Sequence, residues 1–147
     1  MYDKYQLITA LATLSLVVVV VLAHYEGMHY FSNWIQRTRV RPRFRIVVLI
    51  YGLLILHGIE AILFGLAYYW MGNADGFGNV IGSTPLQMRD YLYFSATVYS
   101  TVGFGDLFPT GSLRLVAGVE GVTGLLMITW SASFTYLEMV RYWRDND

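Results

Sequence analysis

The chain has 147 residues, of which 56% are hydrophobic and 14% are charged, a composition typical of a membrane protein rather than of a soluble domain. Ten basic and ten acidic residues cancel, which excludes nucleic acid as an electrostatically attracted partner. Because the chain has no cysteine, disulfide bonds and thiolate metal sites are excluded too. The length fits one domain, and we interpret residues 1–147 as a single transmembrane domain.

Three apolar stretches are long enough to cross a bilayer as helices, which takes roughly 20 residues. We expect a first helix over residues 7–36, an outer helix over residues 45–70 and an inner helix over residues 112–141. The first stretch lacks a basic leader and a small-residue cleavage site, so we interpret it as a retained span and not as a signal peptide.

A shorter helix is expected over residues 85–100, between the second and third spans. At 1.5 Å per residue it measures roughly 23 Å, too little to cross the bilayer, so it should enter the membrane and stop. Thr84 as the cap, Pro85 in the first helical position and Gln87 as the capping-box partner predict where it begins.

Arginines predict the orientation of the chain. They lie between the first two spans, at Arg37, Arg39, Arg41, Arg43 and Arg45, and after the third span, at Arg141 and Arg144. The positive-inside rule puts both groups on the cytoplasmic side, with the N-terminus outside and the C-terminus in the cytoplasm. The alternative role of residues 37–45 is to bind anionic lipid head groups.

The stretch "TVGFGD", residues 101–106, is too polar to cross lipid and follows the short helix directly. Non-helical backbone is tolerated at membrane depth only where it lines a water-filled path or is buried in protein. Gly103 and Gly105 permit backbone conformations in which successive carbonyl oxygens point the same way. Stacked carbonyl oxygens can replace the water shell of a cation, so this stretch predicts a path for cations.

These six residues resemble the selectivity filter of potassium channels, with Phe104 where tyrosine is more usual. The resemblance covers residues 46–140 and is to small bacterial two-transmembrane-type pores, with one extra N-terminal helix here. It implies an all-α membrane protein: three transmembrane helices, a re-entrant pore helix and a filter loop in each subunit of a homotetramer around a central pore. It also implies a bacterial inner (plasma) membrane location and no enzymatic activity.

The resemblance further implies roles for individual residues. K⁺ would bind backbone carbonyl oxygens and the threonine hydroxyl of the filter, whose residues here are Thr101, Val102, Gly103, Phe104 and Gly105. Asp106 would place a ring of carboxylates at the outer mouth.

Three positions depart from the family pattern or leave alternatives open. Thr97 stands where many members have a glutamate that braces the aspartate, and the usual tryptophan neighbour is missing. Glu120 either substitutes for this brace from behind the pore helix or faces the cavity as a charge ring. Gly124 falls where the family has its hinge glycine, but close helix packing explains it equally well.

No regulatory part is evident: the first span lacks the arginines of a voltage sensor, and few residues follow Val140. Every histidine, with two glutamates, lies in or beside the first two spans: His24, Glu26, His29, His57 and Glu60. Spacing of three places Glu26 with His29, and His57 with Glu60, on shared helix faces. A hairpin turning near Arg41 brings His24 and His57 to similar depth.

Three interpretations of this group compete. The first is hydrogen bonding that holds the extra helix to the pore. The second is a sensor of protons or of a divalent metal such as Zn²⁺, and the third is a bis-histidine haem site. A membrane metal- or haem-binding protein is accordingly the alternative function for the whole chain.

Overall fold

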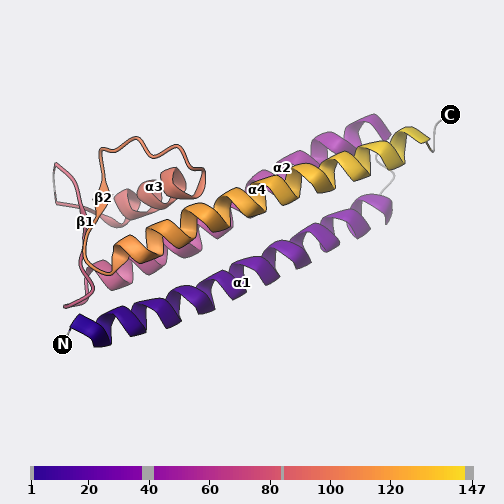
Figure 1. Cartoon of the computed structure of the whole chain (residues 1–147). Coiled ribbons are helices and arrows are strands. Elements are labelled where there is room, and N and C mark those ends of the chain that lie inside the picture. The colour runs from indigo at the N-terminus through magenta and orange to yellow at the C-terminus, as the bar shows by residue number, and fades with distance from the viewer. Residues whose placement is uncertain (1, 38–41, 84, 145–147) are drawn as a thin grey trace.

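The computed structural model describes residues 2–37, 42–83 and 85–144. Three long helices, α1 (Tyr2–Arg37), α2 (Pro42–Gly72) and α4 (Leu113–Arg144), run alongside one another, and the short helix α3 (Met88–Tyr99) lies near one end of them (Figure 1). The three long helices have the length and apolar character needed to cross a membrane. The predicted order of three long apolar helices, with a short helix before the last, is therefore confirmed.

Helix α3 begins at Met88, three residues later than the sequence predicts, and Pro85 lies outside it. Its N-cap is Gln87, whose backbone N–H donates a hydrogen bond to the carboxylate of Asp90 (2.7 Å). Asp90 is an acidic residue in the first turn, where it also interacts favourably with the helix dipole. The predicted cap, Thr84, lies outside the described residues.

Two groups of buried side chains hold the helices together. One joins α1 to α2 and is formed by Met28, Ile35, Leu49, Leu53 and Leu56. The larger one surrounds α3 and includes Phe64 and Tyr68 of α2, Phe94 of α3 and Val116 of α4. Helix α3 thus packs against both α2 and α4 (Figure 1).

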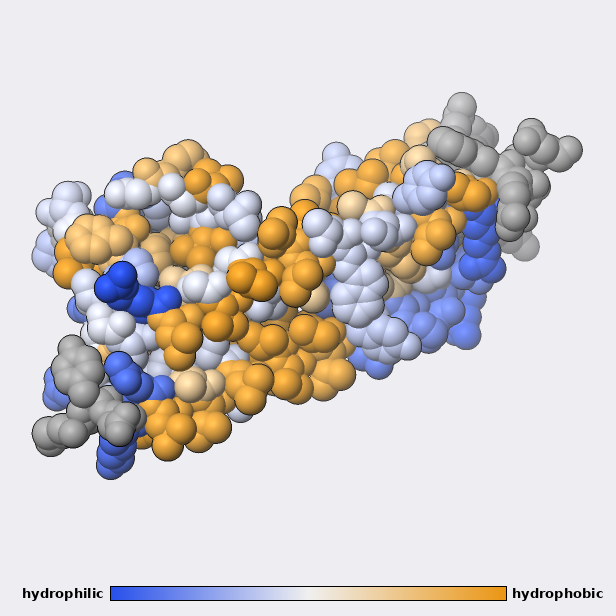
Figure 2. Space-filling model, in the orientation of Figure 1, coloured by the Kyte–Doolittle hydropathy of each residue, from blue (hydrophilic) through white to orange (hydrophobic). Residues whose placement is uncertain are grey.

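The face of the molecule shown in Figure 2 carries a broad apolar zone between two more hydrophilic ends. Large apolar side chains are exposed on each long helix, for example Leu14 on α1, Ile55 on α2 and Leu126 on α4. Such a surface suits contact with lipid.

A small antiparallel pairing joins β1 (Val80–Ile81) to β2 (Phe108–Pro109), with Val80 opposite Pro109. The sequence shows no pattern that predicts this pairing. Thr110 strengthens the connection, because its hydroxyl donates a hydrogen bond to the carbonyl oxygen of Asn79 (2.8 Å). The loop before α3 is thereby tied to the loop that follows residues 101–106, which fixes both ends of the intervening structure.

Candidate functional site

The backbone of residues 101–106 has an unusual conformation. Alternate residues have a positive φ: 61° at Thr101, 51° at Gly103 and 81° at Gly105. Among the described residues, Thr101 is the only non-glycine residue with this property. A β-branched side chain disfavours such a φ, at a cost of order 1–3 kcal/mol. Strain of this kind gathers at functional sites, so the observation points to this segment.

The segment is fastened to the end of α3 on one side and open on the other. The N–H of Thr101 donates to the carbonyl oxygen of Val98 (2.9 Å), and that of Gly103 to the carbonyl oxygen of Thr97 (3.1 Å). In the single chain all six residues are exposed, Phe104 by 70%. A methyl group added at Gly103 would meet no other atom within 4 Å. One face of this backbone is therefore free to meet an ion, or other chains.

Asp106 has a partner that the sequence analysis did not identify. The Tyr93 side chain of α3 interacts with the Asp106 carboxylate. The rings of Tyr93 and Phe104 also stack, with centroids 6.5 Å apart and planes 1° from parallel. Thr97 instead donates its hydroxyl to the carbonyl oxygen of Phe94 in its own helix (2.8 Å). The glutamate and the tryptophan that usually neighbour this aspartate in the family are both missing here. Tyr93 contacts the aspartate instead.

Glu120 of α4 is completely buried and lies behind α3. Its carboxylate accepts hydrogen bonds from the hydroxyls of Ser95, in α3, and Tyr68, in α2. The sequence leaves two locations open for Glu120, behind the short helix or facing the cavity. In the structure it lies behind the short helix. One carboxylate therefore joins three helices, and a bracing role for it remains a prediction.

Gly124 allows α4 to approach the end of α3 very closely. A Cβ atom at this position would lie 2.1 Å from the carbonyl oxygen of Tyr99, a backbone atom that no rotamer change can move. Close packing therefore explains this glycine. Because it has no side chain, α4 can lie directly against the residues that lead into the 101–106 segment.

Three of the five predicted histidine and glutamate residues come together in the interior. Glu60 Oε1 lies 2.8 Å from His24 Nδ1, and Glu60 Oε2 lies 3.3 Å from His57 Nδ1. The prediction that His24 and His57 lie at similar depth is confirmed, since both contact one carboxylate and their ring centroids are 5.3 Å apart. Neither His24 nor Glu60 is exposed.

The structure adds two hydroxyls that sequence reasoning missed. Tyr99, the last residue of α3, donates to Glu60 and lies 3.0 Å from His57 Nδ1. Ser131 of α4 lies 3.2 Å from the other ring nitrogen of His24, Nε2. We call His24, His57, Glu60 and Tyr99 the buried cluster. Together with Ser131, it connects all four helices.

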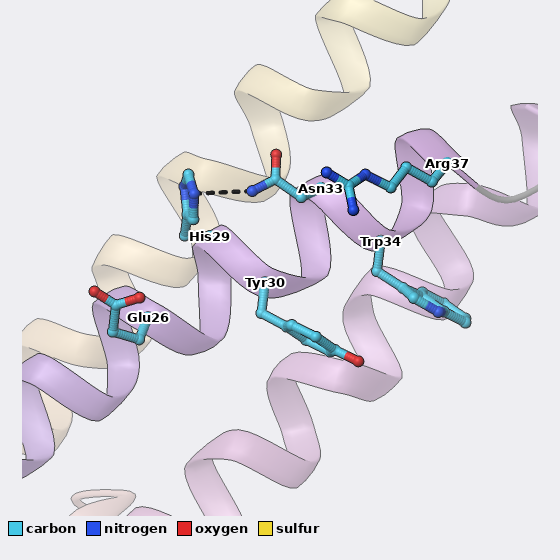
Figure 3. A pocket seen from close by; sticks show the side chains of 6 residues that line it. All are labelled: Glu26, His29, Tyr30, Asn33, Trp34 and Arg37. Atoms are coloured by element: carbon cyan, nitrogen blue, oxygen red, sulfur yellow. Dashed lines mark hydrogen bonds between the residues drawn. The ribbon is translucent and has the colours of Figure 1, made fainter.

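Glu26 and His29 do not belong to the buried cluster. They share a face of α1, as predicted, and this face lines a hollow of about 410 Å³ at the surface (Figure 3). The hollow is lined by Glu26, His29, Tyr30, Asn33, Trp34 and Arg37. His29 accepts a hydrogen bond there from the side-chain amide of Asn33 (2.8 Å).

Comparison with known proteins gives the family. Residues 45–140 match a family model described as an ion channel. The match includes most of α2 and α4 with α3 and residues 101–106 between them, and it covers more than half of the chain. The chain therefore belongs to this ion channel family, which confirms the resemblance to potassium channel pores. With its three membrane-length helices, it is an integral membrane protein.

One curated relative is a membrane protein of Bacillus subtilis strain 168, called uncharacterized membrane protein YdjJ. It is 45% identical to this chain over 51 residues, which are 34% of this chain and 15% of the relative. The chain thus matches a small part of that protein's length. No solved structure matches the chain.

Proposed function

We propose that the chain is one subunit of a homotetrameric, K⁺-selective channel, with residues 101–106 as its filter and α3 as a re-entrant pore helix. The observation that carries this proposal is the alternating positive φ of Thr101, Gly103 and Gly105. Alternation of this kind allows successive carbonyl oxygens to face one side, where they replace the hydration shell of a cation. The function is conduction, and the chain catalyses no reaction.

The open face of the segment supports a tetramer. One strand cannot surround an ion, and Val102 and Phe104 are exposed in the single chain by 56% and 70%. Four copies around an axis would supply a closed ring of carbonyl oxygens and cover these side chains. The end of α3 near Ser100 would then direct the negative end of its helix dipole toward the axis, which lowers the free energy of a cation there.

The arginines support an orientation in a bacterial inner membrane. Arg37 ends α1, and Arg141 lies in the last turns of α4, at the ends of these helices far from α3 (Figure 1). With these ends in the cytoplasm, residues 101–106 open toward the outside, where Asp106 forms a ring at the mouth. Anionic lipid head groups are proposed partners of residues 37–45, of which residues 38–41 lie outside the described part.

The buried cluster supports a second candidate function, that of a membrane metal-binding protein. A haem site does not fit its geometry: the rings of His24 and His57 are 5.3 Å apart, and both direct Nδ1 at Glu60, so no porphyrin fits between them. A small ion does not conflict with conduction, because the cluster and residues 101–106 are separate parts of one chain.

Flux into lipid vesicles tests the proposed function. Vesicles containing the purified protein should take up Rb⁺ and K⁺ while largely refusing Na⁺ and Li⁺. Gly103→Ala and Gly105→Ala should abolish this selectivity, because alanine resists the φ of 51° and 81° at these positions. The matched control is Gly58→Ala, since a Cβ there meets nothing within 4 Å. Equal K⁺ and Na⁺ permeability of the unchanged protein would refute the proposal.

A further inference from the structure

The buried cluster brings together donor atoms that suit a transition metal. His24 comes from α1, whereas His57 and Glu60 lie one turn apart on α2, and one ligand atom from each lies within 4.8 Å of the others. The Tyr99 hydroxyl makes a fourth donor, within hydrogen-bonding distance of both His57 and Glu60. We propose that these four residues form a zinc-binding site in the interior of each subunit.

The distances already approach those of a zinc site. Zinc bonds of 2.0–2.2 Å to nitrogen and oxygen put the ligand atoms of a tetrahedron about 3.4 Å apart. Here His24 Nδ1 and His57 Nδ1 lie 2.8 Å and 3.3 Å from the oxygens of Glu60, and His57 Nδ1 lies 3.0 Å from the Tyr99 oxygen. The ligand atoms of His24, His57 and Glu60 lie within 4.8 Å of one another, so rotations of these side chains would bring them to the tetrahedral spacing.

Charge balance favours a divalent ion at this depth. Two neutral imidazoles, the Glu60 carboxylate and a Tyr99 phenolate carry two negative charges, which Zn²⁺ cancels. The Tyr99 proton would leave to water, and the ring protons of the histidines would move from Nδ1 to Nε2. A neutral complex avoids the free-energy cost of a buried net charge. Imidazole and carboxylate together are ligands that zinc accepts readily.

The surroundings of the cluster resemble the outer shell of a metal site. A histidine that binds a metal through one ring nitrogen usually donates a hydrogen bond from the other. Ser131 occupies that position for His24, 3.2 Å from Nε2. A crevice of about 450 Å³ between α2 and α4 is lined by His57 and Ser131, and it would serve as the entry path of the ion.

The site would act on the proposed filter through Tyr99. This residue ends α3, and Thr101 follows two positions later. Zinc bound to the phenolate would hold the end of α3 to α1 and α2 by coordinate bonds in place of hydrogen bonds. This regulatory consequence depends on the proposed channel function, whereas zinc binding itself does not.

Equilibrium dialysis of the purified, detergent-solubilised protein against zinc chloride tests the site. We expect one zinc per chain in the unchanged protein, and an affinity lowered more than about 100-fold by His24→Ala or His57→Ala. Ser131→Ala should weaken binding by about 10- to 100-fold, the range for an outer-shell partner. The matched control is His29→Ala, which removes an exposed histidine of α1 and should leave binding unchanged. Absence of stoichiometric zinc, or equal binding by His24→Ala, His57→Ala and the unchanged protein, would overturn the proposal.

A measurement on the unchanged protein tests the site even if a substituted protein fails to fold. X-ray absorption at the zinc edge should show four nitrogen or oxygen ligands, of which two are imidazoles. A spectrum without imidazole scattering would refute the site whatever the variants do.

Flux separates the two proposals. Zinc should change Rb⁺ flux of the unchanged protein and of His29→Ala, and it should change that of Tyr99→Phe much less. Zinc binding without an effect on selective flux would refute the regulatory link. Absence of selective flux would refute the channel function, and dialysis would still decide the zinc site.

Discussion

The hydroxyl of Tyr99 donates a hydrogen bond to the carboxylate of Glu60, and this contact joins the last residue of α3 to α2. The 101–106 segment begins two residues after Tyr99. Glu60 also contacts His24 of α1, the helix that lies outside the region matched by the ion channel family. A single carboxylate therefore links α1 to the end of α3, and so to the 101–106 segment. Changes in α1 can therefore reach the proposed filter by a short path of buried polar contacts.

Tyr99→Phe tests this connection. The change removes the hydroxyl that contacts Glu60 and His57 and keeps the ring, and loss of a hydrogen bond to a charged group costs about 1.5–3 kcal/mol. We expect a lower thermal midpoint for the proposed tetramer and a lower ratio of K⁺ to Na⁺ flux. Tyr51→Phe is the control, because Tyr51 is 65% exposed on α2. Equal losses in both variants would contradict a specific role for Tyr99.

Gly124→Ala should separate α4 from the end of α3. The new Cβ would lie 2.1 Å from the carbonyl oxygen of Tyr99, so the helices must move apart. We expect reduced thermal stability together with reduced or unselective flux. Gly118→Ala, in the same helix, places its Cβ where nothing lies within 4 Å and should be neutral or slightly stabilising. Wild-type flux and stability in Gly124→Ala would show that this contact is unimportant.

The bilayer explains how much of the fold is predictable from the sequence. Long apolar runs predict the three spans because lipid leaves few alternatives to a helix. The glycines of the 101–106 segment likewise predict its irregular backbone, since the positive φ at Gly103 and Gly105 is a local property. The register of a helical hairpin was sufficient to place His24 and His57 at one depth. Each of these predictions depends on a short stretch of chain or on a single repeated spacing.

The hydroxyl partners could not be predicted in the same way. Ser95, Tyr99 and Ser131 carry no local signal, because the side chain that each contacts lies far away along the sequence. The pairing of β1 with β2 was missed because each strand has only two residues, too few to show an alternating pattern. The sequence predicts that α3 begins at Pro85, because Thr84 and Pro85 suit the start of a helix. The helix begins later, at Met88, where the Asp90 carboxylate accepts a hydrogen bond from the backbone N–H of Gln87.

Substitutions of Glu120 test the proposed brace behind α3. Glu120→Gln keeps the shape and one acceptor oxygen, so we expect K⁺ flux to persist but to decline at a different rate. Glu120→Ala leaves the hydroxyl of Tyr68 without an acceptor, at about 1–3 kcal/mol, whereas the Ser95 hydroxyl keeps the carbonyl oxygen of Ala61 (2.6 Å) as its acceptor. The proposed tetramer should therefore be less stable in this variant.

The control for both changes is Glu26→Gln, which alters an exposed glutamate of α1. A Glu120→Gln channel with altered block by internal cations and an unchanged time course of flux would instead indicate a charge ring in the cavity.

Tyr93→Phe tests whether the contact with Asp106 stabilises the outer mouth. Phenylalanine keeps the ring that stacks on Phe104 and loses the hydroxyl that interacts with the carboxylate. Because Tyr93 is 41% exposed in the single chain, we expect little change in the thermal stability of the proposed tetramer. Selective flux should persist for a shorter time, since Asp106 then lacks this partner in α3.

A double-mutant cycle shows whether Tyr93 acts through Asp106. If it does, Tyr93→Phe should have almost no further effect on flux in an Asp106→Asn background, because the two residues share one interaction. Tyr91→Phe is the matched control in the same helix: its hydroxyl donates to Asn79 (2.9 Å), so its loss should loosen the loop before α3 and add independently to Asp106→Asn. Additive effects of Tyr93→Phe and Asp106→Asn would mean that the tyrosine affects flux by another route, with its stacking on Phe104 as the next contact to change.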